Sequence, residues 1–196
     1  MLTVHAADLL LPGTGPAVPG GALAVSGHEI AAIGPYEEVS AAHPQARVRR
    51  WSGTLTPGLV HPHGAWLLEH AYHPDPREAD ELGTEPLTGA ALAALDMDDA
   101  RWGASARRGV QRLLAHGVTA LVGPLSRPHS AAAVARAGLT LHPGPRPSPP
   151  VPPSLHPPQD AFALTLAPGT PADFTVATPT TCLATSLAGR LVFRRA

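Results

Sequence analysis

Residues 143–158 contain nine prolines among sixteen residues. Proline fixes its own φ angle and has no N–H group, so this stretch cannot supply the interior of a helix or a central strand of a sheet. We expect an extended polyproline II linker without a fold of its own. The alternative is a proline-rich scaffold that presents a ligand to an SH3- or WW-type partner, although the irregular spacing of the prolines favours a spacer.

The composition indicates a globular protein with little electrostatic character. The net charge of the 196 residues is −1 and the pI is about 6.8, so neither nucleic acid nor an anionic membrane is an expected partner. Hydrophobic residues make up 44% of the chain but aromatic residues only 4%, which predicts a core of alanine, leucine and valine. The start of the chain lacks the basic region of a signal peptide, and no apolar run approaches the roughly 20 residues that span a bilayer, so we expect a cytoplasmic protein.

Two features of the composition exclude particular chemistries. All fourteen basic residues are arginine and the chain contains no lysine, so it can form neither a Schiff base nor a carbamylated metal bridge. Cys182 is the single cysteine, which excludes an internal disulfide and a cysteine-rich zinc site.

Both ends of the chain have the pattern of β-structure. Residues 22–34 predict a hairpin around the turn Ser26-Gly27-His28-Glu29, and residues 35–42 a short helix with Pro35 at its first turn. After the proline-rich stretch the pattern returns to short strands. Those strands are expected at 162–166, 174–177 and 191–193.

The middle of the chain alternates strands and helices. Asp98 or Asp99 caps a predicted helix over about 100–116, on which Arg107, Arg108 and Arg112 fall on the solvent side. An apolar strand follows at 118–122, then a helix at 130–137 and a third strand at 139–141. Residues 58–142 therefore predict a βαβαβ unit with a parallel sheet.

Five stretches resemble the metal-dependent amidohydrolase superfamily, most closely its imidazolonepropionase-like and aminofutalosine-deaminase-like branches. They are similar, in chain order, to an early hairpin, the entry into the first barrel strand, the helix and strand that follow, and two closing strands. These stretches are "GHEIAAIG" (27–34), "GTLTPGLVHPHG" (53–64), "RGVQRLLAHGVTALV" (108–122), "PGTPADFTV" (168–176) and "AGRLVFRR" (188–195).

The resemblance implies an α/β fold in which both chain ends form a composite β-sandwich beside a partial TIM-barrel remnant. The implied domains are the two halves of the β-domain, 1–57 and 159–196, the βαβαβ remnant, 58–142, and the linker, 143–158. A complete barrel takes roughly 250 residues, and only about twenty separate the third strand from the returning β-structure, too few for five more βα units of some 25–30 residues each. The sequence therefore resembles a truncated member that lacks most of the barrel.

His61 and His63 are the candidate metal ligands. Residues i and i+2 of a strand share one face, so both imidazoles could approach one Zn²⁺ or similar divalent ion. In the resembled family the remaining ligands come from later strands, and the absence of lysine excludes a binuclear form. His142, at the end of the third strand, or His73, in the loop after His63, could complete a local site. The alternative is that His61 and His63 are remnants whose ring nitrogens bond to backbone or water.

Two functions follow from the resemblance. The first is an amidohydrolase-like protein without catalysis of its own, which acts through a partner or a small ligand, with no catalytic residue assigned. Because the open edge of the barrel remnant would be apolar, we expect self-association or a protein partner to cover it. The second is a residual metal-dependent hydrolase of a C–N bond, in a cyclic amide or an aminopurine, completed in trans.

Overall fold

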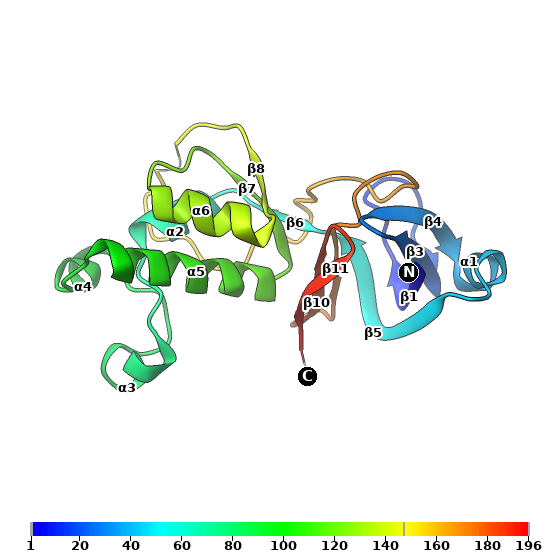
Figure 1. The fold of residues 1–196 in the computed structure, drawn as a ribbon, viewed down its shortest axis with the longest axis horizontal. Helices are drawn as coiled ribbons and strands as arrows, with labels where there is room; N and C mark the ends of the chain where they lie inside the picture. Colours follow the sequence, from blue (N-terminus) through cyan, green and yellow to red (C-terminus); the bar gives the residue numbers. More distant parts are fainter. Residues whose placement is uncertain (1, 147, 196) are drawn as a thin grey trace. The chain divides into compact units, whose positions relative to one another are not determined.

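A computed structural model describes residues 2–146 and 148–195 of the chain as a mixed α/β fold (Figure 1). Its strands form an eight-stranded mixed sheet and a three-stranded sheet, which confirms the predicted α/β class. The chain divides into two compact units: the first comprises residues up to Val60, Leu114–Thr119 and the residues from Pro158 onward, and the second comprises His61–Leu113 and Ala120–Pro157. No helix in the described part of the chain is both long and apolar enough to cross a membrane.

The large sheet combines strands from both sides of the proline-rich segment. The strand order is β11-β10-β9-β5-β1-β3-β4, with β2 paired to β1. The strands are β1 (Leu2–Leu10), β2 (Val18–Pro19), β3 (Gly21–Ser26), β4 (Glu29–Pro35), β5 (Arg47–Pro57), β9 (Phe174–Ala177), β10 (Cys182–Leu187) and β11 (Arg190–Arg194). The two halves join where β5 pairs antiparallel with β9, in the register Leu55↔Val176. The strands that the sequence assigned to a sandwich are thus joined in one continuous hydrogen-bonded sheet.

Local sequence signals explain the elements of this unit. The β3–β4 hairpin forms where predicted, with Gly27 at φ +62° in the turn, and α1 (Tyr36–Ala42) follows Pro35. Asp173 has a structural role, because its Oδ1 accepts a 2.6 Å hydrogen bond from the N–H of Ala188 between β10 and β11. The main core is built mostly from aliphatic side chains around the buried ring of Phe174, with Trp51 partly buried against it, as the low aromatic content predicts.

The second unit holds the predicted alternation of strands and helices. The three-stranded sheet has the order β6-β7-β8, and its β7 and β8 strands are parallel, with Val122 opposite His142. The elements are β6 (Leu59–His61), α2 (Gly64–His70), η1 (Pro76–Glu78), α3 (Ala79–Leu82), α4 (Gly89–Ala93), α5 (Asp99–Ala115), β7 (Val118–Val122), α6 (Pro128–Ala137) and β8 (Thr140–His142). Asp98 caps α5 by accepting a 2.7 Å hydrogen bond from the N–H of Arg101, and Gly117 and Gly138 follow α5 and α6 at φ +83° and +81°.

The proline-rich segment forms no helix or strand in its described residues, 143–146 and 148–158; Pro147 lies outside the described residues. It is not a free spacer, because Leu155 is only 9% exposed. The strand predicted at 162–166 is reduced to one antiparallel bridge between Leu59 and Phe162. Two hydrogen bonds lie beside this bridge: the N–H of Val60 donates to the carbonyl of Ala161, and the N–H of Ala163 donates to the carbonyl of Gly58. Strand β6 is only three residues long, so it is too short to pair with a full strand at 162–166.

Candidate functional site

His61 ends strand β6, and its imidazole is bonded on both sides to main-chain groups. The side chain is 2% exposed. Its Nε2 lies 2.9 Å from the carbonyl oxygen of Ser154, and its Nδ1 accepts a 3.2 Å hydrogen bond from the N–H of His63. A neutral imidazole has one donor and one acceptor, so these partners require the tautomer with the proton on Nε2. The ring therefore has no lone pair left for a metal ion in this arrangement.

His63 does not share a strand face with His61. Strand β6 ends at His61, and His63 is the N-cap residue of α2, so the alternation that would aim both rings at one point stops between them. Pro62 contributes to this turn because it has no N–H for a strand ladder. Nδ1 of His63 is buried and has no hydrogen-bond partner among the described residues. A Cβ at Gly64 would lie 2.3 Å from Cδ2 of Leu121, so glycine is what allows α2 to begin here.

His73 is a structural residue of the second unit. It is 1% exposed, its Nε2 donates to the carbonyl of Leu67 at 3.1 Å, and its main-chain N–H donates to Oγ of Ser105 at 2.9 Å. Burial lowers the pKa of its imidazole to about 4, so the ring is neutral at pH 7.

His142 lies on β8 and is partly exposed. Residues 2–146 and 148–195 contain no group of three or more His, Cys, Asp or Glu side chains that could hold a metal ion. The site composed of His61, His63 and either His142 or His73 therefore stays a prediction from the sequence.

Glu69 carries out a role that its place in the sequence did not reveal. Its carboxylate is buried, at 3% exposure, yet it accepts hydrogen bonds from the N–H of Ser126 at 2.5 Å, the N–H of Arg127 at 2.6 Å and Oγ of Ser126 at 2.8 Å. These three donors satisfy the charge that burial would otherwise penalise. The signal for this role was a lone carboxylate inside the apolar run of α2. The group anchors the loop before α6 and is not a free general base.

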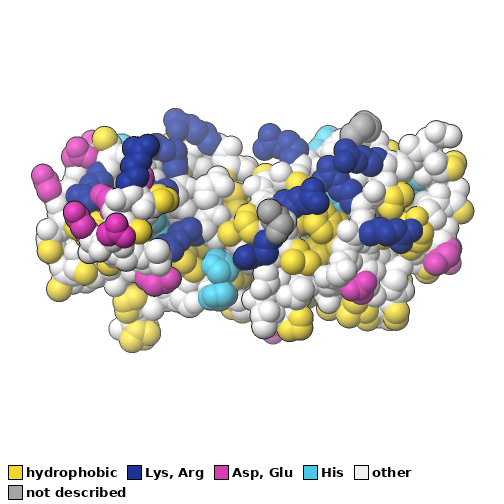
Figure 2. Space-filling view, turned by 90° about the horizontal axis from the view of Figure 1, so that it is seen from below, with side chains coloured by type: hydrophobic (Ala, Val, Ile, Leu, Met, Phe, Trp, Pro, Cys, Tyr) yellow, Lys and Arg dark blue, Asp and Glu magenta, His cyan; other side chains and the backbone are white. Residues whose placement is uncertain are grey.

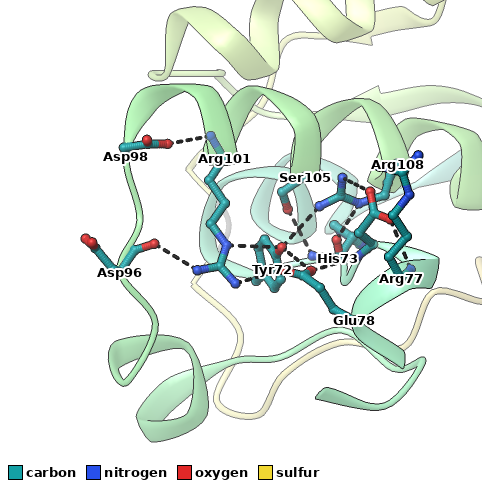
Figure 3. A network of polar contacts seen from close by, with 10 residues as sticks. Tyr72, His73, Arg77, Glu78, Asp96, Asp98, Arg101, Ser105 and Arg108 are labelled. Atoms are coloured by element: carbon teal, nitrogen blue, oxygen red, sulfur yellow. Dashed lines mark hydrogen bonds and ion pairs between the residues drawn. The ribbon is translucent and has the colours of Figure 1, made fainter. Parts of the chain in front are cut away.

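A second polar network surrounds the phenol of Tyr72 (Figure 3). The Tyr72 hydroxyl donates to Oε2 of Glu78 at 2.5 Å and accepts from Nε of Arg101 at 3.2 Å and Nη2 of Arg108 at 3.3 Å. Arg101 also pairs with Oε1 of Glu78 at 3.0 Å. The hydrogen bond from Tyr72, with further bonds from Asp75 and Arg101, lowers the pKa of the Glu78 carboxyl.

The same network corrects the prediction that Arg108 lies on the solvent side of α5. Its Nε donates to the carbonyl of His73 at 2.7 Å and its Nη1 lies 3.3 Å from Oδ2 of Asp75. Arg101 and Arg108 are seven residues apart, two turns of the helix, and this spacing was the signal that both reach one side. Glu78 is paired with Arg101, and Asp75 with Arg108. The network therefore fixes the loop after α2 to α5.

Comparison with known proteins gives one family match. Residues 21–46 match the imidazolonepropionase-like composite domain of bacteria, which confirms for this part of the chain the resemblance stated above. No curated protein sequence matches the chain significantly.

Solved structures similar to the chain include an ochratoxinase and two deaminases. A. niger ochratoxinase is 21% identical, with 72% of this chain and 31% of that chain covered and a TM-score of 0.49. Adenosine deaminase from Xanthomonas campestris, with bound zinc, is 18% identical over 71% and 32%, with a TM-score of 0.47. Helicobacter pylori aminofutalosine deaminase is 14% identical over 73% and 35%, with a TM-score of 0.46. The chain spans about a third of the length of these proteins.

Proposed function

We propose that the chain is an amidohydrolase-like protein, with an imidazolonepropionase-like composite β-domain, that has no catalysis of its own and acts through a partner or a small ligand. The family match over residues 21–46 supports the composite domain. The absence of catalysis is supported by one observation: both ring nitrogens of His61 are bonded to main-chain groups.

The chemistry of a metal ligand explains why this observation matters. An imidazole binds a metal ion through the lone pair of an unprotonated nitrogen. In His61 the proton faces Ser154 and the lone pair faces the N–H of His63, so the first residue of the pair does not fit a metal as it stands. A lysine-bridged site is impossible because the chain has no lysine.

The experiment combines metal analysis with ¹⁵N NMR of the histidine rings, on protein purified without a polyhistidine tag. We expect less than about a tenth of an equivalent of bound metal, and the His61 ring in its Nε2-protonated tautomer, unchanged when Zn²⁺ is added. Stoichiometric metal that is lost in the double variant His61→Ala, His63→Ala would refute the proposal. The variant His28→Ala, at an exposed histidine, is the control for non-specific binding.

The proposed partner covers the open edge of the three-stranded sheet. Residues 161–163 already hydrogen-bond along β6, whereas β8 is the last strand at the other edge. Leu141 on β8 is 41% exposed, which places an apolar side chain beside unpaired strand backbone, a combination that favours association. Light scattering coupled to size exclusion tests this: Leu141→Glu should reduce association, and Val151→Glu, at another exposed hydrophobic residue, should not. A monomer at all concentrations would contradict it.

A residual metal-dependent hydrolase of a C–N bond, completed in trans, is the second candidate. It is favoured by Nδ1 of His63, a buried ring nitrogen without a hydrogen-bond partner among the described residues. If a second chain completes the site, specific activity toward a cyclic amide or an aminopurine should rise with protein concentration and disappear in His63→Ala. Turnover no higher than that of His63→Ala at every concentration would exclude it.

A further inference from the structure

The arginines of the first unit are concentrated in two short stretches of the sequence. The first unit contains six arginines, all of them at 47–50 or 190–195, in or directly after β5 and β11. Its carboxylates lie elsewhere in the sequence. Figure 2 shows arginine side chains gathered in a row beside hydrophobic ones over the strands of this unit. A net charge of −1 for the chain therefore conceals a strongly basic surface.

Three of these arginines form what we call the arginine face: Arg47, Arg49 and Arg194. Arg47, Arg49 and Trp51 alternate along β5 and so share one side of the strand. The guanidinium of Arg194 lies over the Trp51 ring, 5.8 Å from its centroid, which brings the end of β11 to the same place. No member of the arginine face is ion-paired with a carboxylate among the described residues.

The second unit contains a segment of opposite charge. Residues 80–99, the acidic segment, hold six carboxylates and no arginine. Three of them, Asp80, Glu81 and Glu85, are exposed and form no ion pair with any described residue. The chain thus carries two complementary surfaces, and neither the arginine face nor these three carboxylates form an ion pair with a described residue.

We propose that the arginine face is a docking surface for a second copy of this chain, which it binds through the carboxylates of that copy's acidic segment. Guanidinium groups pair well with carboxylates, and several pairs together give orientation and specificity. The contact joins two different surfaces, so a bound pair still presents one free arginine face on one copy and one free acidic segment on the other. Such a heterologous contact extends to rings or open chains, and the assembly grows beyond a dimer as the concentration rises. This inference is independent of the proposed function.

Other polyanions fit the arginine face less well. A single-stranded nucleic acid would stack its bases on exposed rings. Trp51, the aromatic ring that Arg194 covers, is also stacked on His5, at 6.1 Å between centroids and 8° between planes. Attraction of nucleic acid or an anionic membrane from a distance also needs a net positive field, and the chain has a net charge of −1.

Charge-swap variants test the docking. Sedimentation velocity of the Leu141→Glu variant, which lacks the association proposed for the edge of β8, should show association beyond a dimer at about 0.01 M salt, where the screening length is about 30 Å. About 1 M salt should return this variant to monomers. In the same Leu141→Glu background, the variant Arg47→Glu, Arg49→Glu and the variant Asp80→Arg, Glu81→Arg should each lose self-association by about tenfold or more in dissociation constant. A mixture of the two variants should associate again, because each reversed surface then meets a complement. The control is Arg107→Glu, Arg136→Glu, which changes the charge equally at arginines of the second unit that lie outside both surfaces.

Three results would overturn the proposal. The first is a Leu141→Glu variant that stays monomeric at low salt across the concentration range. The second is association that both reversals leave unchanged, or a mixture of the two variants that stays monomeric, since the acidic segment would then pair within its own chain or not at all. The third is binding of duplex DNA or anionic vesicles that requires Arg47 and Arg49 while the Leu141→Glu variant stays monomeric. That result would assign the arginine face to a different polyanion.

Discussion

The carbonyl oxygen of Ser154 lies 2.9 Å from Nε2 of His61, so the proline-rich segment accepts a hydrogen bond from the first of the two histidines, His61 and His63. A stretch that has the composition of a spacer is thereby attached to the residue that resembles a metal ligand. Leu155, the next residue, is 9% exposed, and we expect its burial to hold the segment in place.

Replacing Leu155 by aspartate should loosen the segment around His61. A buried carboxylate without partners is costly, so the segment should open more often and the Nε2 proton of His61 should exchange with solvent about tenfold faster or more. Hydrogen exchange followed by NMR measures this rate. The matched control is Val151→Asp in the same segment, at a side chain 68% exposed, which should leave the rate unchanged. Equal rates in both variants would mean that Leu155 does not hold the contact.

Replacing Glu69 by alanine should cost about 3 kcal/mol of unfolding free energy, because it leaves two main-chain N–H groups and a hydroxyl without their acceptor. Glu69→Gln should cost less, since its amide oxygen can still accept. Denaturant titration measures both losses against Glu85→Ala, an exposed carboxylate, for which about 0.5 kcal/mol or less is expected. A loss for Glu69→Ala as small as that of the control would refute the anchoring role.

Acidification should unfold the protein through two buried histidines. Burial lowers the pKa of His5 and of His73 from 6.5 to about 4. Between these values the unfolded chain binds more protons than the folded one, so the stability is fully present above pH 6.5 and is lost as the pH falls toward 4. Each group contributes a loss of about 3 kcal/mol by the end of that range.

Unfolding free energy measured from pH 7 to pH 4 checks this loss. His73→Gln should flatten the dependence, because glutamine does not titrate, whereas His28→Gln, at a side chain 75% exposed, should leave it as steep as in the wild type. If the unfolding free energy of His73→Gln depended on pH as steeply as that of the wild type, His73 would not be the source of its expected part of the loss.

Replacing Tyr72 by phenylalanine removes the oxygen on which Glu78, Arg101 and Arg108 converge. The loss should be about 1–3 kcal/mol, the usual range when hydrogen bonds to charged groups are removed, and the pKa of Glu78 should move up toward its ordinary value because Tyr72 is the largest cause of its lowering. Thermal unfolding and NMR titration of the carboxyl measure the two effects. Tyr36→Phe is the matched control, because Arg50 lies over the Tyr36 ring at 4.3 Å and uses the ring face alone. Equal losses in both variants would contradict the network.

Elements that depend on neighbouring residues were predictable from the sequence. The hairpin over β3 and β4 follows from its turn, α5 follows from Asp98 at its start and Gly117 beyond its end, and the strand at β7 follows from its apolar run. These signals act over a few residues, so they do not depend on how the rest of the chain folds. The resemblance also indicated that strands from both ends combine, as the pairing of β5 with β9 shows.

The partners of the polar side chains were decided by the tertiary structure. Glu69 meets Ser126 and Arg127 across more than fifty residues, and Trp51 meets Arg194 across a longer separation still. No local pattern encodes such pairs, because their geometry depends on how distant elements pack. The sequence by itself indicated that a strand lies within "TPGLVHPHG" (56–64), where strand β6 is found. Only the tertiary structure decided that strand β6 ends at His61 and that Ser154 occupies its Nε2, since a ring nitrogen bonds to whichever group the fold brings within reach.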